Sequence, residues 1–290
     1  AMGDEPFLVT QGVRLWTDRT LAELLERMLA LSKFDEAALR EWQSLLAREA
    51  EIPFFLMAMR GERAVMDDLL ENTQKGEISF RNLSRFITDL KRSNSPPTPG
   101  WSTDLATYRD TLRFYVSVRG LRAAMLERGN AHVKIANLPD KEKLQALEAL
   151  GTEPLPENTL SLDFISTSPR GTTKRFLINY LRHKAQFRSA QAALAAERFR
   201  LAQKRWPANL EELVPDYLAA VPEDPFNGER LRFVRKPWGL VIYSVGQDLI
   251  DNGGTLTAPE VEADGPDVGF ILYDPDKRRQ PAKPFPFPPR

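Results

Sequence analysis

The sequence lacks cysteine and contains only two histidines among its 290 residues. The absence of cysteine excludes a disulfide framework, a thiol nucleophile and any cysteine-ligated zinc or iron–sulfur site. A serine–histidine–acid triad would have to use His132 or His183. Because neither lies near a nucleophile elbow or in a zinc-binding HExxH pair, we expect no catalytic role for either histidine and no enzymatic activity.

The chain also lacks an excess of charge of one sign and any long apolar run. Its 40 basic and 40 acidic residues give a net charge of zero, whereas nucleic-acid-binding domains usually carry a basic excess. No apolar run reaches the roughly 18 residues that indicate a membrane span. We therefore expect no nucleic-acid partner, and membrane association only through a segment outside this chain. The nucleotide-binding patterns GxxxxGK[ST] and GxGxxG are absent as well.

Apolar residues recur at helical spacing over most of the first 205 residues. Residues 1–16 and 152–172 are predicted to be irregular, the second stretch because it is rich in proline, serine and threonine. The predicted helices cover, in order, about 18–29, 35–49, 54–72, 79–90, 103–128, 139–150 and 173–204. Pro207 ends the last of these helices.

The pattern changes from helical to alternating after Pro222. Asn227-Gly228 predicts a tight turn, and the predicted strands cover 231–235, 240–244 and 268–273. The fold class predicted is α+β, with a mainly helical N-terminal region followed by a long helix and a small antiparallel sheet. We predict a helical domain over 1–172, a helix-plus-sheet domain over 173–273 and a proline-rich tail over 274–290.

Four short pieces stand out in the last third of the chain. They are the helix end Ala196–Pro207, the turn Asp224–Gly228, the segment Tyr243–Asp248 and the acidic return Ala263–Val268. In this order they resemble the globular head of the type II secretion major pseudopilin. The first 170 residues lack the apolar N-terminal helix of that family. With Ala58–Ala64, the whole chain resembles instead a group of uncharacterised bacterial proteins that carry such a head.

The resemblance implies a non-enzymatic envelope or secretion-related protein whose pseudopilin-like head serves assembly or partner binding. The partners implied are proteins of unknown identity. The location implied is the cell envelope or periplasm, with a membrane anchor, if any, in the full-length protein.

The resemblance also implies a calcium ion in the loop between the last strands. The oxygens would come from the side chains of Asp248, Asp251, Asn252 and Asp267, with the Val245 carbonyl matched to a family position and Asp264 in reserve. Calcium favours several oxygen ligands of this kind. The residues alone leave an alternative open, because aspartate and asparagine beside glycine are common turn formers. Their spacing is not that of an EF-hand.

A different function class stays open at this point. An enzyme or small-molecule-binding protein could hold its ligand in a pocket between the N-terminal helices. A deep polar pocket with converging acidic side chains in the first 180 residues would favour it. Membrane-surface binding through the basic residues of the tail is a weaker third possibility.

Overall fold

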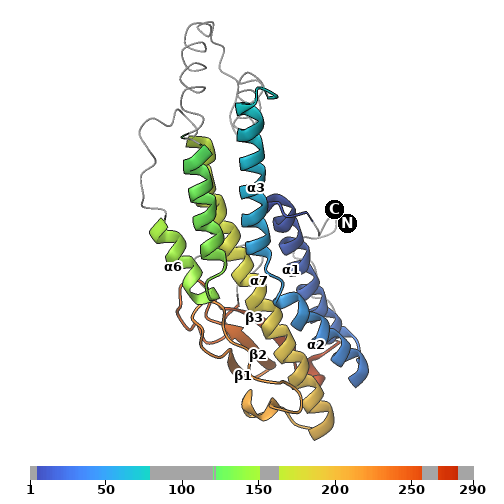
Figure 1. Cartoon of the computed structure of the whole chain (residues 1–290). Helices are drawn as coiled ribbons and strands as arrows, with labels where there is room; N and C mark the ends of the chain where they lie inside the picture. The colour runs from blue at the N-terminus through green and yellow to red at the C-terminus, as the bar shows by residue number, and fades with distance from the viewer. Residues whose placement is uncertain (1–4, 79–119, 121, 151–162, 257–266, 280–290) are drawn as a thin grey trace, which may run out of the picture. The chain divides into compact units, whose positions relative to one another are not determined.

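The computed structural model describes residues 5–78, 120, 122–150, 163–256 and 267–279, and it shows helices together with a small antiparallel sheet (Figure 1). The predicted α+β class is therefore confirmed. The named helices are α1 (Leu8–Leu31), α2 (Glu36–Ala50), α3 (Phe54–Gln74), α6 (Asp140–Leu150) and α7 (Asp163–Gln203), and residues 122–136 are also helical. The strands are β1 (Arg232–Lys236), β2 (Gly239–Ser244) and β3 (Val268–Tyr273).

The chain divides into two compact units that are not contiguous in sequence. Unit 1 comprises Ala1–Arg14 and Pro53–Ile178, and unit 2 comprises Leu15–Ile52 and Asn179–Arg290. This division differs from the expected boundary at residue 172, because α2 and most of α1 group with the sheet. The predicted helices did not indicate which of them would pack against the strands.

Unit 1 contains α3, the 122–136 helix, α6 and the first part of α7. Phe55 stacks on Phe176 with 6.2 Å between ring centroids. The Arg122 guanidinium donates to carboxylates of Asp67 and Glu71 on α3, at 2.7 Å each. An apolar contact and a polar clamp on half-exposed side chains therefore join α3 to its neighbours.

Three consecutive residues of the Ala58–Ala64 piece each hold a different segment of unit 1. A side chain at Gly61 would place its Cβ 1.6 Å from the Pro6 carbonyl oxygen, so only glycine admits the N-terminal segment here. The Glu62 carboxylate accepts the Leu8 N–H at the start of α1, at 3.0 Å. Arg63 donates to Asn130 at 2.6 Å. This piece has a structural role that its sequence did not reveal.

Unit 2 has one apolar core built from α1, α2, α7 and the sheet, and Figure 1 shows the strands beside the C-terminal half of α7. A run of small residues of α7 lies in this core, since Ala192, Ala193, Ala195 and Ala196 are all fully buried. Helix α2 begins where the Asp35 side chain accepts the Ala38 N–H at 2.8 Å, as an N-cap does.

The sheet has the order β1-β2-β3 and two different faces. Both pairings are antiparallel, with Phe233 opposite Ile242 and Ile242 opposite Phe270. These residues, with Leu240 and Leu272, point toward the core. The alternate residues, among them Arg232 and Tyr243, occupy the other face, because successive side chains of a strand point to opposite sides.

The predicted strands and the tight turn are confirmed, but the irregular structure predicted for residues 8–16 and 163–172 is wrong. Residues 1–4 and 152–162 of these predicted regions lie outside the described residues. Helix α1 begins at Leu8 rather than near residue 18, and α7 begins at Asp163 rather than at Thr173. Apolar residues between 8 and 17 fall on two opposite faces and so form no single stripe. In α7 the helix continues through Pro169 and Gly171, the residues that predicted a loop. The predicted 79–90 helix lies outside the described residues.

Candidate functional site

The turn Asp224–Gly228 and the end of β2 are joined by one buried carboxylate. Asp224 is 1% exposed, and its Oδ1 accepts from the Phe226 N–H at 2.9 Å and from Ser244 Oγ at 2.8 Å. Its Oδ2 accepts the Val245 N–H at 2.9 Å. Because three neutral donors converge on it, Asp224 fixes the turn against the strand. Two of the pieces that carry the resemblance therefore meet in space.

The loop after β2 contains most of the residues expected to bind calcium. Val245 is fully buried at the start of this loop. The Asp248 carboxylate accepts the Ile250 N–H two residues later, at 3.1 Å, which is the geometry of a local turn. Gly246 and Gly254 have positive φ, as does Leu249. At this end of the loop the acidic residue thus closes its own turn.

Asp251 lies between an arginine and a tyrosine from the sheet. Its Oδ2 is 3.0 Å from Arg232 Nε, and its Oδ1 accepts the Tyr243 hydroxyl at 3.0 Å. The Gly253 N–H, the Tyr243 hydroxyl and Arg232 together hold the pKa of Asp251 below its usual range. Burial and the bond to Asp251 raise the pKa of Tyr243. Asp251 is therefore ionised at neutral pH and already faces a positive charge.

Asp267 closes the loop from the start of β3. It is fully buried and accepts the N–H groups of Asn252 at 3.2 Å and Gly254 at 2.7 Å. Burial raises its pKa, and the backbone donors oppose that shift. The Asn252 side chain donates to the Ile250 carbonyl at 3.2 Å. Asp251 and Asp267 thus both accept backbone N–H groups of residues 252–254.

Two cationic side chains of β1 reach this loop, and sequence reasoning missed both. Arg232 pairs with Asp251, and Lys236 Nζ donates to the Gly253 carbonyl at 2.8 Å. They lie four residues apart in a strand and hence on the same face. A side chain at Gly254 would come within 2.7 Å of Val234 on that face. The alternation of Arg232, Val234 and Lys236 was the signal that could have revealed the contact.

A calcium ion requires six to eight oxygen ligands. Within the described residues, no group of three or more histidine, aspartate or glutamate side chains is placed to hold a metal ion. Asp264 lies outside those residues. A calcium ion held by Asp251 and Asp267 would have to take the place of Arg232 at the Asp251 carboxylate.

The two histidines occupy helices. His183 Nε2 is 3.3 Å from Asp18 Oδ2, and its ring lies 4.2 Å from that of Phe187 in the interior of unit 2. Burial, together with nearby Arg128, lowers the pKa of His132 to about 4, so this imidazole is neutral at pH 7. The contacts of His183 are thus with a carboxylate and an aromatic ring inside unit 2.

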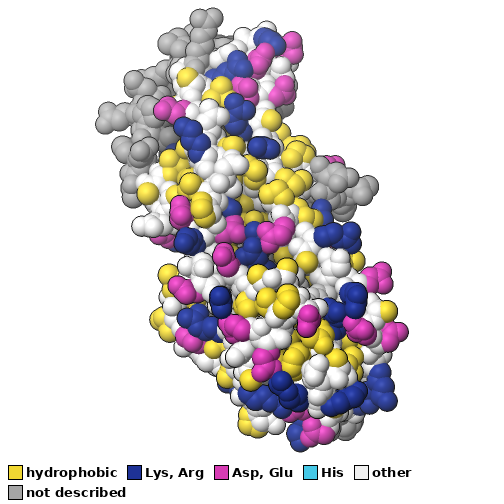
Figure 2. All heavy atoms as spheres, turned by 60° about the horizontal axis from the view of Figure 1, so that its bottom comes forward, with side chains coloured by type: hydrophobic (Ala, Val, Ile, Leu, Met, Phe, Trp, Pro, Cys, Tyr) yellow, Lys and Arg dark blue, Asp and Glu magenta, His cyan; other side chains and the backbone are white. Residues whose placement is uncertain are grey.

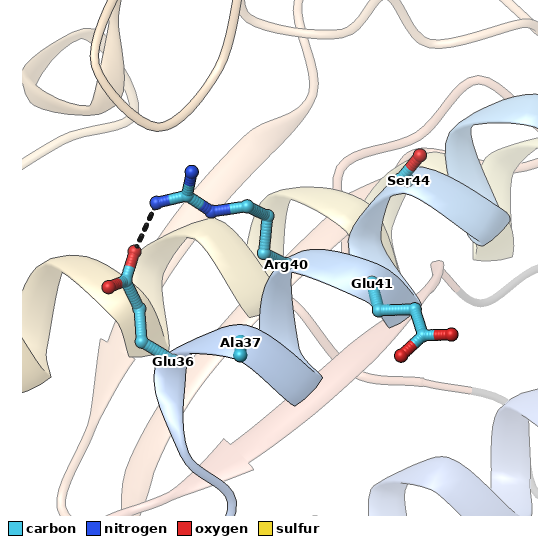
Figure 3. A pocket seen from close by; sticks show the side chains of 5 residues that line it. All are labelled: Glu36, Ala37, Arg40, Glu41 and Ser44. Carbon is cyan, nitrogen blue, oxygen red and sulfur yellow. Dashed lines mark hydrogen bonds and ion pairs between the residues drawn. The ribbon is translucent and has the colours of Figure 1, made fainter.

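One hollow among the described residues lies on α2, within the helical region. Figure 3 shows its lining, Glu36, Ala37, Arg40, Glu41 and Ser44, along one side of the helix, with Glu36 and Arg40 joined at 2.7 Å. All five residues are exposed. This hollow is an open surface of a single helix and does not have converging acidic side chains.

The surface of the described residues carries mixed charge. Figure 2 shows basic and acidic side chains interspersed over the face in view. None of the described helices combines the length and apolar character that a bilayer span requires.

Comparison of the chain with protein-family models, with curated proteins and with solved structures gave no match. The resemblance to a pseudopilin head therefore stays a prediction that depends on the residues quoted above.

Proposed function

We propose that this chain is a non-enzymatic envelope or secretion-related protein whose unit 2 is a pseudopilin-like head for assembly or partner binding. The observation that carries the proposal is the contact between pieces of the resemblance. Asp224 of the turn binds Ser244 and Val245 of the next piece, and Asp267 of the last piece binds the loop between them. These two buried carboxylates hold the turn and the loop beside the sheet.

Calcium binding by the loop belongs to the same proposal. Asp251 and Asp267 would supply carboxylate oxygens, with Val245, Asp248 and Asn252 as the further ligands expected from the sequence. The bound ion would order the loop between β2 and β3. Its role would be structural, because a partner surface needs a loop of fixed shape.

The proposal is tested by locating the native protein in the cells that produce it and crosslinking it there. We expect recovery with the cell envelope and crosslinks to proteins. An Asp224→Ala variant, which removes the carboxylate that joins the turn to β2, should lose those crosslinks. Asp216→Ala, at an exposed aspartate of unit 2, should keep them. Recovery in the cytosol alone, with no protein adduct, would reject the envelope role.

The enzyme or small-molecule alternative has its own test at the α2 hollow. A ligand that binds only the folded state raises stability, by about 2.7 kcal/mol at one hundred times its dissociation constant. A library compound that raises the melting temperature of the wild type but not of Glu41→Ala would favour this alternative over assembly.

A further inference from the structure

Helix α1 is apolar on two opposite faces. One face is in the interior and includes Leu15, Ala22, Leu25 and Leu29, all buried. The opposite face carries large apolar side chains that are 41–74% exposed, namely Val9, Val13, Trp16, Leu24, Met28 and Leu31. Trp16, the largest of them, is 71% exposed. We call this second set, with Thr20 and Arg27, the α1 surface.

The spacing of the α1 surface keeps it on one side of a straight helix. Positions 9, 20 and 31 are eleven apart, as are 13 and 24. An eleven-residue repeat corresponds to about 3.67 residues per turn, close to the 3.6 of an α-helix. The stripe therefore does not wind around α1, and a partner helix can follow it along the whole element.

A continuous exposed apolar stripe marks a contact with another protein or with a membrane. Single exposed apolar residues are ordinary on a protein surface. Six on one face of a helix form a contiguous patch, which is not ordinary. The 24 residues of α1 span about 36 Å. A specific interface needs roughly 600 Å² from each partner, and one aromatic side chain supplies about 150–250 Å² of it when buried.

We propose that the α1 surface pairs with the same surface of a second copy of this chain, antiparallel, about a twofold axis at Thr20. The inference rests on the proposed role in assembly and names the partner. Trp16 and Leu24 lie four residues on either side of Thr20, and Val9 and Leu31 lie eleven on either side. In a twofold interface residue i contacts residue j and j contacts i. Trp16 thus faces the partner's Leu24.

The size of the central residue fits this arrangement. Thr20 is small and exposed, so two helices can approach closely at the axis. The bulky Trp16 lies one turn away and meets a leucine rather than a second tryptophan. Large and smaller side chains therefore alternate across the contact, which is how packed helices fill space.

Charge favours the antiparallel direction. Arg27 is the one charged member of the α1 surface, and it lies seven residues after Thr20, where Val13 lies seven before. In the antiparallel pair the stem of Arg27 covers the partner's Val13, and its guanidinium reaches water. In a parallel pair each Arg27 would face its own copy, and like charges would oppose pairing.

The first test is the mass of the full chain in solution as its concentration rises to roughly 100 µM. We expect a dimer for the wild type and a monomer for Trp16→Lys and for Leu24→Lys. Leu249→Lys is the matched control, because Leu249 is 58% exposed but lies in the loop after β2; it should remain a dimer. A monomeric wild type, or a Trp16→Lys variant that stays dimeric, overturns the proposal.

The second test reads the direction of pairing from disulfides, since the chain has no cysteine of its own. Thr20→Cys should form a crosslinked dimer on oxidation, because the two copies meet at the axis. Val13→Cys should not, because its two copies lie about 21 Å apart in the antiparallel pair. The reverse result overturns the proposal. A monomeric chain that still fractionates with the envelope rejects this pairing and leaves the proposed function intact.

Discussion

The contacts inside unit 1 differ in kind from the contacts inside unit 2. In unit 1 the charged side chains that join helices are partly exposed, as Arg122, Asp67 and Glu71 are. In unit 2 polar side chains are taken into the interior. Glu197 is bound by Arg278 through two bonds of 2.7 and 2.8 Å, and both side chains are nearly inaccessible.

Unit 2 repeats this arrangement between its helices. Arg198, 7% exposed, donates to Gln43 at 2.9 Å and to Glu36 at 3.1 Å. Gln43 in turn donates to the Tyr217 carbonyl at 2.7 Å. Burial raises the pKa of Glu197, but hydrogen bonds from Arg200 and Arg278 outweigh burial and the net pKa is lowered. Glu197 is therefore a carboxylate that remains charged inside the unit.

Because of this difference, we expect the two units to lose stability through different kinds of substitution. A buried polar group is costly unless every partner is in place, so unit 2 should respond to the loss of single hydrogen-bonding atoms. Unit 1 depends on shape and should respond to added volume, as the approach of Pro6 to Gly61 shows. Substitutions in each unit test this contrast.

The largest effect is expected at Asp224. In Asp224→Ala the Phe226 N–H, the Val245 N–H and the Ser244 hydroxyl lose their acceptor, and each buried unsatisfied donor costs about 1–3 kcal/mol. We expect the free energy of unfolding to fall by about 3–5 kcal/mol, measured by denaturant titration. Asp248→Ala is the control, with an expected loss of about 1 kcal/mol or less. Equal losses in the two variants would contradict the role assigned to Asp224.

The second prediction concerns Glu26, which covers the free edge of the sheet. Its carboxylate accepts the Ile271 N–H of β3 at 2.8 Å. Burial raises the pKa of Glu26, the hydrogen bond from Ile271 opposes this rise and Glu23 adds to it, and the net pKa is about 7. The unfolded chain ionises near pH 4.5, so between pH 4.5 and 7 the folded state binds more protons and stability falls as pH rises.

Glu26→Gln keeps an oxygen for Ile271 and removes this titration. We expect its stability to match the wild type near pH 4 and to exceed it by up to about 3 kcal/mol at pH 8. The measurement is the free energy of unfolding from pH 4 to 8, with Glu41→Gln, at an exposed acid of α2, as the control. A constant difference between Glu26→Gln and the wild type at every pH would reject the assignment.

The third prediction tests unit 1 by volume. Gly61→Ala places a Cβ against the Pro6 carbonyl, so the N-terminal segment must shift, at about 1–3 kcal/mol. The matched control is Gly120→Ala, because a Cβ at this helical position meets nothing within 4 Å. There alanine should stabilise by about 0.5–1 kcal/mol. Opposite signs in thermal melting support the steric reading, and a stabilised Gly61→Ala would reject it.

Sequence reasoning recovered the fold class and the strands because their signals are local. Alternation and the Asn227-Gly228 turn are contained in short windows, and the strand bounds agree to within one residue. The start of α1 was missed because its apolar residues lie on two opposite faces, so the sequence shows no single apolar stripe at helical spacing. Which helices join the sheet was also missed, since such pairing joins residues as distant in sequence as Glu26 of α1 and Ile271 of β3.

The candidate site was predicted only in part for the same reason. Asp251 and Asp267 were placed in one loop because they flank it in sequence. The two cationic side chains that reach this loop are Arg232, which pairs with Asp251, and Lys236, which binds the Gly253 carbonyl. Both come from a strand whose face could be assigned only after the register was known. The Asp224 turn was noted as a pattern, but its three donors were not foreseen.

The fourth prediction asks whether calcium and Arg232 compete for Asp251. Arg232→Gln removes an ion pair that is partly exposed, so it should cost about 0.5–1 kcal/mol without metal. With Asp251 released, calcium should raise the melting temperature of this variant more than that of the wild type, while magnesium should raise neither. Asp267→Asn should abolish the calcium effect. No shift in either protein at millimolar calcium would mean that the loop holds no metal.

The smallest effect is expected at Arg122, and it is the most direct test of the contrast. Arg122→Gln breaks the contacts with Asp67 and Glu71 in unit 1, but all three groups keep access to water, which screens the interaction. We expect a change in melting temperature close to the error of measurement. The identical substitution in unit 2, Arg198→Gln, should produce a clear loss, because Gln43 and Glu36 would lose a buried donor. If the two variants melted alike, buried polar contacts would not be what distinguishes unit 2.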